Sequence, residues 1–462
     1  MGVGFKQIRD DCIAILIMAV MFCMPPAISA ASQADFRDKL TPFFDLFSSD
    51  SGKVDNAFRN IDSRWHEGYV PMLLEVQRFT RDPDVAVRLI GLLHKRTGQD
   101  FGFDMHGWQQ WLWNREERRL PYYAMFKSML YGQIDPKFAA YFSAERPARI
   151  RLDEIVWGGV VQDGIPPLRS PKMMAPDEAH YLADDNVVFG LAINRDARAY
   201  PKRILAWHEM FVDDVGGVPV TGAYCTLCGS MILYKSQAGG STHRLGTSGF
   251  LYRSNKLMYD METQSLWNTL WGFPVLGPLV DQNIQLERLS VVTTTWGGWR
   301  RRHPDTSVLS LDTGHVRDYS EGEAYRRYFA TDELMFTVPE LDRRLGNKDE
   351  VLGVIFPQYP DKPLAIAADY LSEHPVFQDR VEELRFVVLT DASGANRVYE
   401  ARDVTFTHWD GQESVIDTNG GTWSLSENKL IASDGRSLHR LPAHRAFWFG
   451  WYSAYSHSRL VH

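Results

Sequence analysis

Two cysteines three positions apart are the residues of this chain whose types and spacing are best suited to chemistry. Cys225 and Cys228 stand in the run Tyr-Cys-Thr-Leu-Cys-Gly, and the two other cysteines, Cys12 and Cys23, lie in an N-terminal segment that we expect to be removed. A Cys-x-x-Cys pair can anchor a metal, cycle between dithiol and disulfide, or form a small structural disulfide. From the sequence alone, all three roles stay open.

The residues after the pair favour a turn between two strands. The run Met231-Ile-Leu-Tyr234 is typical of a strand, whereas the pair in thioredoxin-like proteins opens a helix whose N-terminus lowers the pKa of the first thiol. Gly229, directly after Cys228, suits a tight turn with a positive φ angle. Such a turn can point backbone N–H groups at sulfur, as in thiolate metal sites.

A tetrahedral metal site built on two thiolates needs further ligands. Two histidines are candidates, so the predicted metal ligands are Cys225, Cys228, His208 and His444. Two thiolates with imidazole suit Zn²⁺, Cu(I) or iron. In the alternative interpretation, each histidine is a buried residue of the core.

The N-terminus has the pattern of a signal peptide over residues 1–31. Lys6 and Arg9 precede an uncharged apolar run, Cys12–Met24, and small residues follow the Pro25-Pro26 break. The 13 residues of that run are fewer than the roughly 20 that a membrane span needs. We therefore expect a periplasmic or secreted protein, in a compartment where disulfides persist. An uncleaved anchor is the alternative.

The composition excludes several function classes. The chain has 462 residues, room for two or three domains, and a formal net charge of -8 without a basic stripe. This argues against nucleic acid as a partner. No second apolar run approaches membrane length, so we expect no transmembrane span after signal removal. Gly246-Thr-Ser-Gly249 lacks the lysine of a phosphate loop, so no nucleotide cofactor is assigned.

The chain changes character near residue 150. Residues 32–150 favour helices: Val85, Leu89, Leu92 and Leu93 fall on one helical face. The segment 83–102 resembles one unit of a HEAT-type helical repeat. From residue 151 onward, short apolar stretches alternate with turns, which indicates strands. The predicted fold class is α+β, with a helical N-terminal domain followed by a β-rich domain.

Six segments recur in the same order within the β-rich part, which indicates a tandem duplication. The clearest echo sets Trp296-Gly-Gly-Trp299 against Trp448-Phe-Gly-Trp451, and another sets Val188 against Val351. We expect copy one over residues 151–318, a charged connection over 319–349 and copy two over 350–462. Only copy one carries cysteines, and only copy two has His444 at its place in the repeat. A site at the seam could therefore combine both halves.

Several of these motifs also carry a resemblance to a known family. They are Asp163-Gly-Ile-Pro-Pro, Arg198-Ala-Tyr-Pro, Trp207-His-Glu, Tyr224-Cys-Thr-Leu-Cys-Gly, Gly246-Thr-Ser-Gly, Ser265-Leu-Trp and His303-Pro-Asp-Thr. In this order they resemble the exported bacterial and archaeal proteins grouped as domain of unknown function 3179. Thr226, where the family usually has proline, departs from the pattern. The resemblance implies export and a shared β-rich body, and it supplies no reaction.

From these observations we expect an exported cell-envelope protein that binds a metal through the cysteine pair. Two alternatives remain open: a periplasmic thiol/disulfide oxidoreductase, and a non-catalytic binding or scaffold protein with a structural disulfide. The sequence does not decide whether the protein is an enzyme, and it assigns no catalytic residue. It also leaves open whether the partner is a small molecule or a protein.

Overall fold

The computed structural model of the chain describes residues 30–143 and 146–462. The chain divides into two compact units after Ile155. The predicted leader falls almost entirely outside the described residues. Within the described residues, helices are either too short or too polar to cross a membrane.

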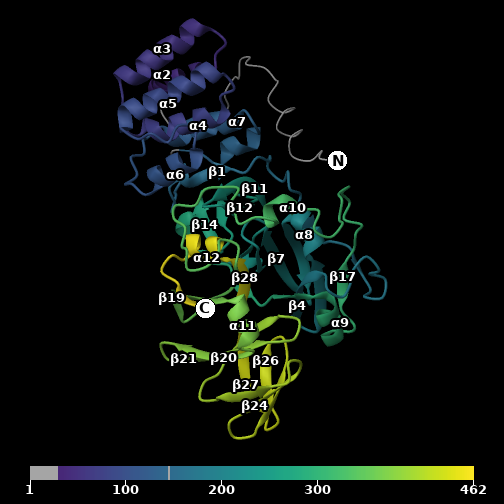
Figure 1. The fold of residues 1–462 in the computed structure, drawn as a ribbon. Helices are drawn as coiled ribbons and strands as arrows, with labels where there is room; N and C mark the ends of the chain where they lie inside the picture. The colour runs from purple at the N-terminus through teal and green to yellow at the C-terminus, as the bar shows by residue number, and fades with distance from the viewer. Residues whose placement is uncertain (1–29, 144–145) are drawn as a thin grey trace. The chain divides into compact units, whose positions relative to one another are not determined.

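The first unit is helical, as predicted, and is coloured purple to blue in Figure 1. Asp82 caps α5 by accepting hydrogen bonds from two backbone N–H groups, Pro83 is its first residue, and Gly98 ends it at a φ of 71°. The helices of this unit are α2 (Ala30–Asp45), α3 (Ser51–Ser63), α4 (Tyr69–Phe79), α5 (Pro83–Thr97), α6 (Met105–Trp113) and α7 (Tyr123–Gly132), followed by the short η1 (Pro136–Ala140) and η2 (Leu152–Glu154).

The second unit is rich in strands, which confirms the α+β class. Its first part contains β2 (Leu168–Arg169), β3 (Met173–Met174), β4 (Val187–Ile193), β5 (Asp196–Pro201), α8 (Lys202–His208), β6 (Met210–Val215), β7 (Val218–Cys225), β8 (Ser230–Lys235), β11 (Leu245–Tyr252), β12 (Asn255–Asp260), β13 (Leu266–Asn268), β14 (Phe273–Leu276), β15 (Arg288–Leu289), β16 (Val292–Thr295), α9 (Trp296–Arg302) and β17 (Ser307–Leu309). These strands form sheets with the orders β16-β4-β5-β17-β3 and β15-β8-β7-β6-β2, and β11 to β14 pair in sequence.

From β18 onward, the rest of the second unit has an element order similar to that from β4 in the first part, which also contains β9 (Gln237–Ala238) and β10 (Ser241–Thr242). It contains α10 (Arg326–Phe329), β18 (Glu350–Phe356), β19 (Tyr359–Ala367), α11 (Ala368–Glu373), β20 (Val376–Val381), β21 (Leu384–Thr390), β22 (Asn396–Glu400), β23 (Phe406–Trp409), β24 (Ser414–Asp417), β25 (Thr422–Leu425), β26 (Lys429–Ala432), β27 (Ser437–Leu441), β28 (Ala443–Phe447), α12 (Trp448–Ala454) and β29 (Arg459–Val461). The sheet order β28-β18-β19-β29 has the pairing pattern of β16-β4-β5-β17, with a parallel pair at the end of each.

The echoed tryptophans occupy matching places in the two parts. A Cβ atom on Gly190 would lie 2.3 Å from Trp299, and one on Gly353 would lie 2.0 Å from Trp451. Each indole N–H donates to a hydroxyl at 2.9 Å: Trp299 to Thr306, and Trp451 to Ser458. The helices α9 and α12 therefore each pack against a strand position where only glycine leaves room for the tryptophan ring.

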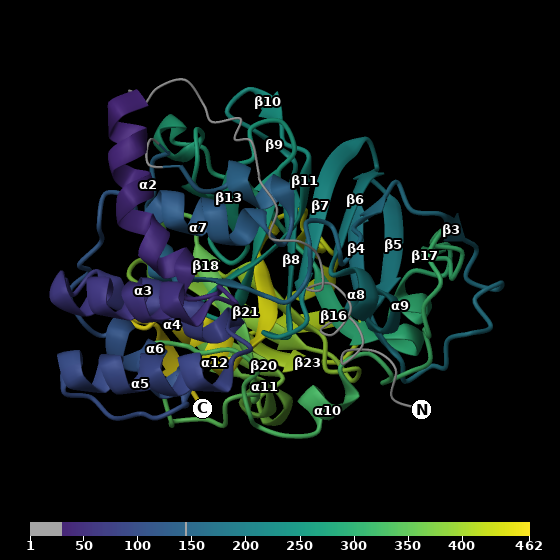
Figure 2. The ribbon, with the colours of Figure 1, turned by 90° about the horizontal axis from the view of Figure 1, so that it is seen from above.

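Eight strands of the second part form a nearly closed barrel, in the order β20-β21-β22-β27-β26-β25-β24-β23. Figure 1 shows these strands in light green to yellow, and Figure 2 shows the unit from above. The Gln378 side chain on the first strand bridges both backbone groups of Phe406 on the last, at 2.9 and 2.8 Å. Val387, Trp423 and Leu430 are among the residues that fill the interior.

Candidate functional site

The cysteine pair lies in the hairpin that joins β7 to β8, as the sequence predicts. Cys225 is the last residue of β7 and pairs with Ser230, the first residue of β8. Gly229 has the expected positive φ, 59°. A Cβ atom there would lie 2.9 Å from the Phe447 ring, so this position also requires the missing side chain.

Both thiols are free and buried, with exposed fractions of 1% for Cys225 and 0% for Cys228. The Cys228 thiol donates a hydrogen bond to the carbonyl oxygen of Ser254 at 3.4 Å and accepts one from Asn255 Nδ2 at 3.3 Å. Gly450 in α12 covers it, because a Cβ atom on Gly450 would lie 3.2 Å from Cys228 Sγ. The second part of the unit thus closes over the thiols of the first.

A buried cation and a buried carboxylate stand beside the thiols. Lys256 on β12 donates to the carbonyl oxygens of Glu209 and Tyr224, the latter at 3.1 Å, and its Nζ lies 3.7 Å from Glu209 Oε2. Glu209 follows α8 with a positive φ of 54° and accepts hydrogen bonds from Thr226 and Tyr325. Sequence reasoning assigned no role to Lys256; its place beside the apolar run Leu257–Tyr259 is the signal that could have found it.

The surroundings shift the pKa values of the two thiols in opposite directions. Burial and the nearby Glu209 charge raise the pKa of Cys225, but the hydrogen bond from the Cys228 thiol, with the backbone and the charge of Lys256, outweighs them and brings the pKa below its ordinary value of 9.0. Burial, together with the bond to Cys225, raises the pKa of Cys228 well above that value. The arrangement therefore favours a thiolate at Cys225 and a protonated thiol at Cys228.

Unpaired polar atoms also concentrate in this region. Four buried side-chain atoms, on Tyr224, Ser230, Ser254 and Asn255, have no hydrogen-bond partner among the described residues. All four residues belong to, or directly contact, the strands and turn that carry the cysteines. Such groups are rare in folded proteins and cost free energy, and one recognised reason for them is a functional centre.

His208 is buried with other partners. It ends α8, and its Nδ1 lies 2.9 Å from the carbonyl oxygen of Pro166, while its Nε2 lies 2.6 Å from the Tyr319 hydroxyl. Burial lowers its pKa to about 4. Both ring nitrogens are thus engaged away from the cysteines, and Glu209 turns to Thr226 and Tyr325 rather than to the imidazole.

His444 lies on β28, where it pairs with Gly353 and packs on the Trp451 ring. Its Nε2 has no hydrogen-bond partner among the described residues. Burial lowers its pKa to about 3. Among the described residues, no group of three or more His, Cys, Asp or Glu side chains is placed to hold a metal ion. Ligation by the two histidines stays a prediction.

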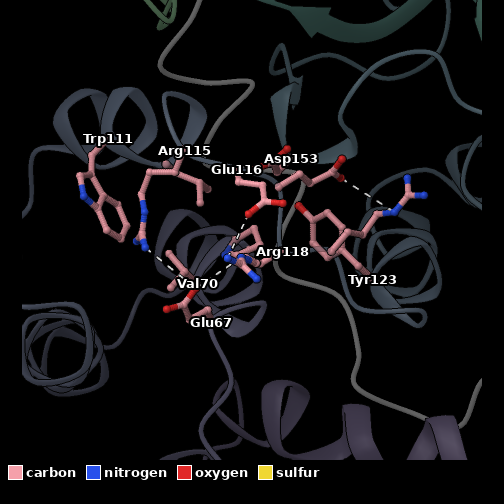
Figure 3. A pocket seen from close by; sticks show the side chains of 12 residues that line it. Glu67, Val70, Trp111, Arg115, Glu116, Arg118, Tyr123 and Asp153 are labelled. Carbon is pink, nitrogen blue, oxygen red and sulfur yellow. Dashed lines mark ion pairs between the residues drawn. The ribbon is translucent and has the colours of Figure 1, made fainter.

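A pocket in the first unit, shown in Figure 3, contains charges that pair with one another. Arg118 contacts Glu116 at 3.0 Å and Glu67 at 3.8 Å, and Arg115 lies 3.9 Å from Glu67. Arg115 also stacks over Trp111. These contacts pair both arginines with carboxylates of the lining.

The fold and the thiol centre define a β-rich body with a buried dithiol, attached to a helical unit. The model of the family described as "Protein of unknown function (DUF3179)" matches residues 162–458. The chain therefore belongs to that family, as the motifs predict, and the match covers both parts of the second unit. No curated protein and no solved structure matches the chain. Its function must be argued from the site.

Proposed function

We propose that Cys225 and Cys228 form a thiol/disulfide redox pair. The observation that carries the proposal is the arrangement of the two thiols with Lys256 and Glu209. The pair is followed by β8 and does not open a helix of its own, so it lacks the usual source of thiolate stabilisation in such pairs. The buried ammonium group and the Cys228 thiol supply that stabilisation instead.

The reaction would be exchange with an organic disulfide. The Cys225 thiolate attacks one sulfur of the substrate, the substrate S–S bond breaks, and the first substrate thiolate leaves. Cys228 then attacks Cys225 Sγ in the mixed disulfide and releases the second substrate thiolate, which takes the Cys228 proton. The protein pair loses two electrons and becomes a disulfide, while the substrate gains two electrons and becomes one thiolate and one thiol, and the thiolate takes up a proton from water.

Trapping the mixed disulfide tests this assignment. In the Cys228→Ser variant, treated with oxidised glutathione, we expect a stable adduct of one glutathione on Cys225, because the resolving thiol is gone. The matched Cys225→Ser variant should give little adduct, because the remaining thiol has a raised pKa. Intact-mass spectrometry reads both. Equal adduct formation in the two variants would contradict the assigned roles.

Metal binding by the pair is the second candidate, and the turn favours it. The positive φ of Gly229 is the geometry in which a turn points N–H groups at metal-bound sulfur. Zinc, copper or iron would suit two thiolates. Elemental analysis of protein purified without oxygen separates the candidates: stoichiometric metal that disappears in Cys225→Ser would favour this one.

We also propose that the protein is exported and that its second unit arose by tandem duplication. Export rests on the pattern of residues 1–31, and mass spectrometry that found an intact N-terminus in soluble cell-envelope protein would refute cleavage.

Duplication rests on the shared element order and on the matched glycine–tryptophan contacts. In the second part, Thr390 closes the hairpin as Cys225 does in the first. An experimental structure with Trp299 and Trp451 in unrelated surroundings would contradict it.

A further inference from the structure

The cysteine pair is buried partly by a long segment without regular sheet structure. We call residues 319–341 the cover. Between β17 and β18 the chain contains only one helix, α10, and no strand. Irregular segments of this length within a compact unit are uncommon, and many of them are lids over sites.

The cover forms part of the buried cluster that contains the thiols. Tyr328 and Val338 belong to the same buried cluster as Cys225 and Cys228, and Phe329 and Phe336 pack against it. The side chains above the sulfurs are therefore mostly aromatic and apolar. Cys225 is 1% exposed, and the cover shares the burial of the thiols with Phe447 and Phe449 of the second part.

Two phenol groups hold the cover to the site. Tyr328 donates to the carbonyl oxygen of Leu227, inside the Cys-x-x-Cys turn, at 2.8 Å. Tyr325, itself at a positive φ of 58°, lies 3.2 Å from Glu209 Oε1 and donates to it. Both bonds end on the groups that shape the thiol centre.

Residues that follow the cover in the chain hold it in place through hydrogen bonds. Lys348 donates to the carbonyl oxygens of Tyr328 and Thr331 and lies over the Tyr328 ring. Asp332 accepts from the backbone N–H groups of Asn347 and Lys348, the latter at 2.9 Å. These hydrogen bonds hold the cover at residues 328–332, while the two phenol hydrogen bonds attach it to the thiol site.

We propose that the cover is a gate that must open before the cysteine pair can react with a partner. The gate regulates the site of the proposed redox function and rests on that proposal. Its opening is a local equilibrium that requires no unfolding of the β sheets. Weakening the phenol bonds should therefore raise thiol reactivity without changing which thiols react.

The test measures the rate of alkylation by iodoacetamide in the full-length reduced protein. We expect slow labelling in the native state. Each of Tyr328→Phe and Tyr325→Phe should raise the rate about fivefold, because one hydrogen bond contributes roughly 1 kcal/mol to the closed state. The matched control is Tyr399→Phe: Tyr399 also donates to a backbone carbonyl, that of Ser426, at 2.7 Å, but in the second part of the unit. It should leave the rate unchanged.

Two results would overturn the gate. One is native thiols that react as fast as those of the denatured protein. The other is Tyr399→Phe raising the rate as much as the cover variants, which would mean labelling through general unfolding. Iodoacetamide reacts with any accessible thiol, so this test is independent of redox activity. A pair that is gated but never oxidises would refute the proposed function alone.

Discussion

Replacing Lys256 with methionine is expected to raise the pKa of Cys225 and to destabilise the second unit by about 3–5 kcal/mol. Methionine is an unbranched apolar side chain one atom shorter than lysine, and the change removes the ammonium group whose charge lowers the pKa of Cys225. The pKa rises because a buried thiolate loses its positive neighbour. Stability falls because Glu209 is left as a buried charge without its cation. Thiolate absorbance against pH and denaturant unfolding measure the two effects.

A double variant separates these effects. Glu209→Gln in the Lys256→Met background removes the uncompensated carboxylate, so part of the lost stability should return. The pKa of Cys225 should also fall relative to Lys256→Met alone, because the Glu209 charge that raises it is gone, although the ammonium group is still absent. A Lys256→Met protein with an unchanged Cys225 titration would show that Lys256 does not tune the pair.

Replacing His444 with valine is expected to make the protein less sensitive to acid. Burial lowers the pKa of His444 to about 3 from an ordinary 6.5. As pH falls below 6.5, the unfolded chain takes up a proton that the folded protein refuses, so folded stability falls from pH 6.5 towards pH 3. At about 1.4 kcal/mol per pKa unit, the loss at pH 4 is roughly 3 kcal/mol. The His444→Val variant should not show this loss of stability.

The valine is the residue at the equivalent place in the first part, Val292, which pairs with Gly190 as His444 pairs with Gly353. Urea unfolding at pH 7 and pH 4 gives the two free energies. His457→Val is the control, because His457 is exposed, and it should leave the difference between the two pH values nearly intact. If His444→Val leaves the difference intact as well, the histidine is not the buried neutral group described here.

Local sequence patterns predicted much of this architecture. The sequence pattern places Val85, Leu89, Leu92 and Leu93 on one helical face, and they are the buried residues of α5, because helical periodicity depends only on nearby residues. Gly229 predicted the turn in the same way, because a positive φ is a property of one residue. The recurring tryptophan motifs coincide with two short helices, α9 and α12, and the duplication that they suggest stays a prediction.

The composition of the thiol site was harder to predict, because it depends on segments far apart in the chain. Lys256 lies 47 residues from the Glu209 carbonyl oxygen that it contacts, and only the register of β12 brings them together. Tyr328 reaches Leu227 across 101 residues through a segment without sheet pattern. His208 stays a predicted ligand, and the partners of its ring, Pro166 and Tyr319, lie 42 and 111 residues away in the chain.

A redox titration of the full-length protein tests the central claim most directly. The protein is equilibrated with buffers that contain reduced and oxidised dithiothreitol or glutathione, and the exchange is then quenched with acid. Free thiols of the unfolded protein are alkylated, and intact-mass spectrometry counts them. We predict one reversible transition between two free thiols and one Cys225–Cys228 disulfide, with a tenfold change in the ratio for each potential step of about 30 mV, as for any two-electron couple. Cys225→Ser should abolish it. Thiols that stay reduced under every buffer, or a disulfide that no buffer reduces, would contradict the proposal that this pair performs redox chemistry.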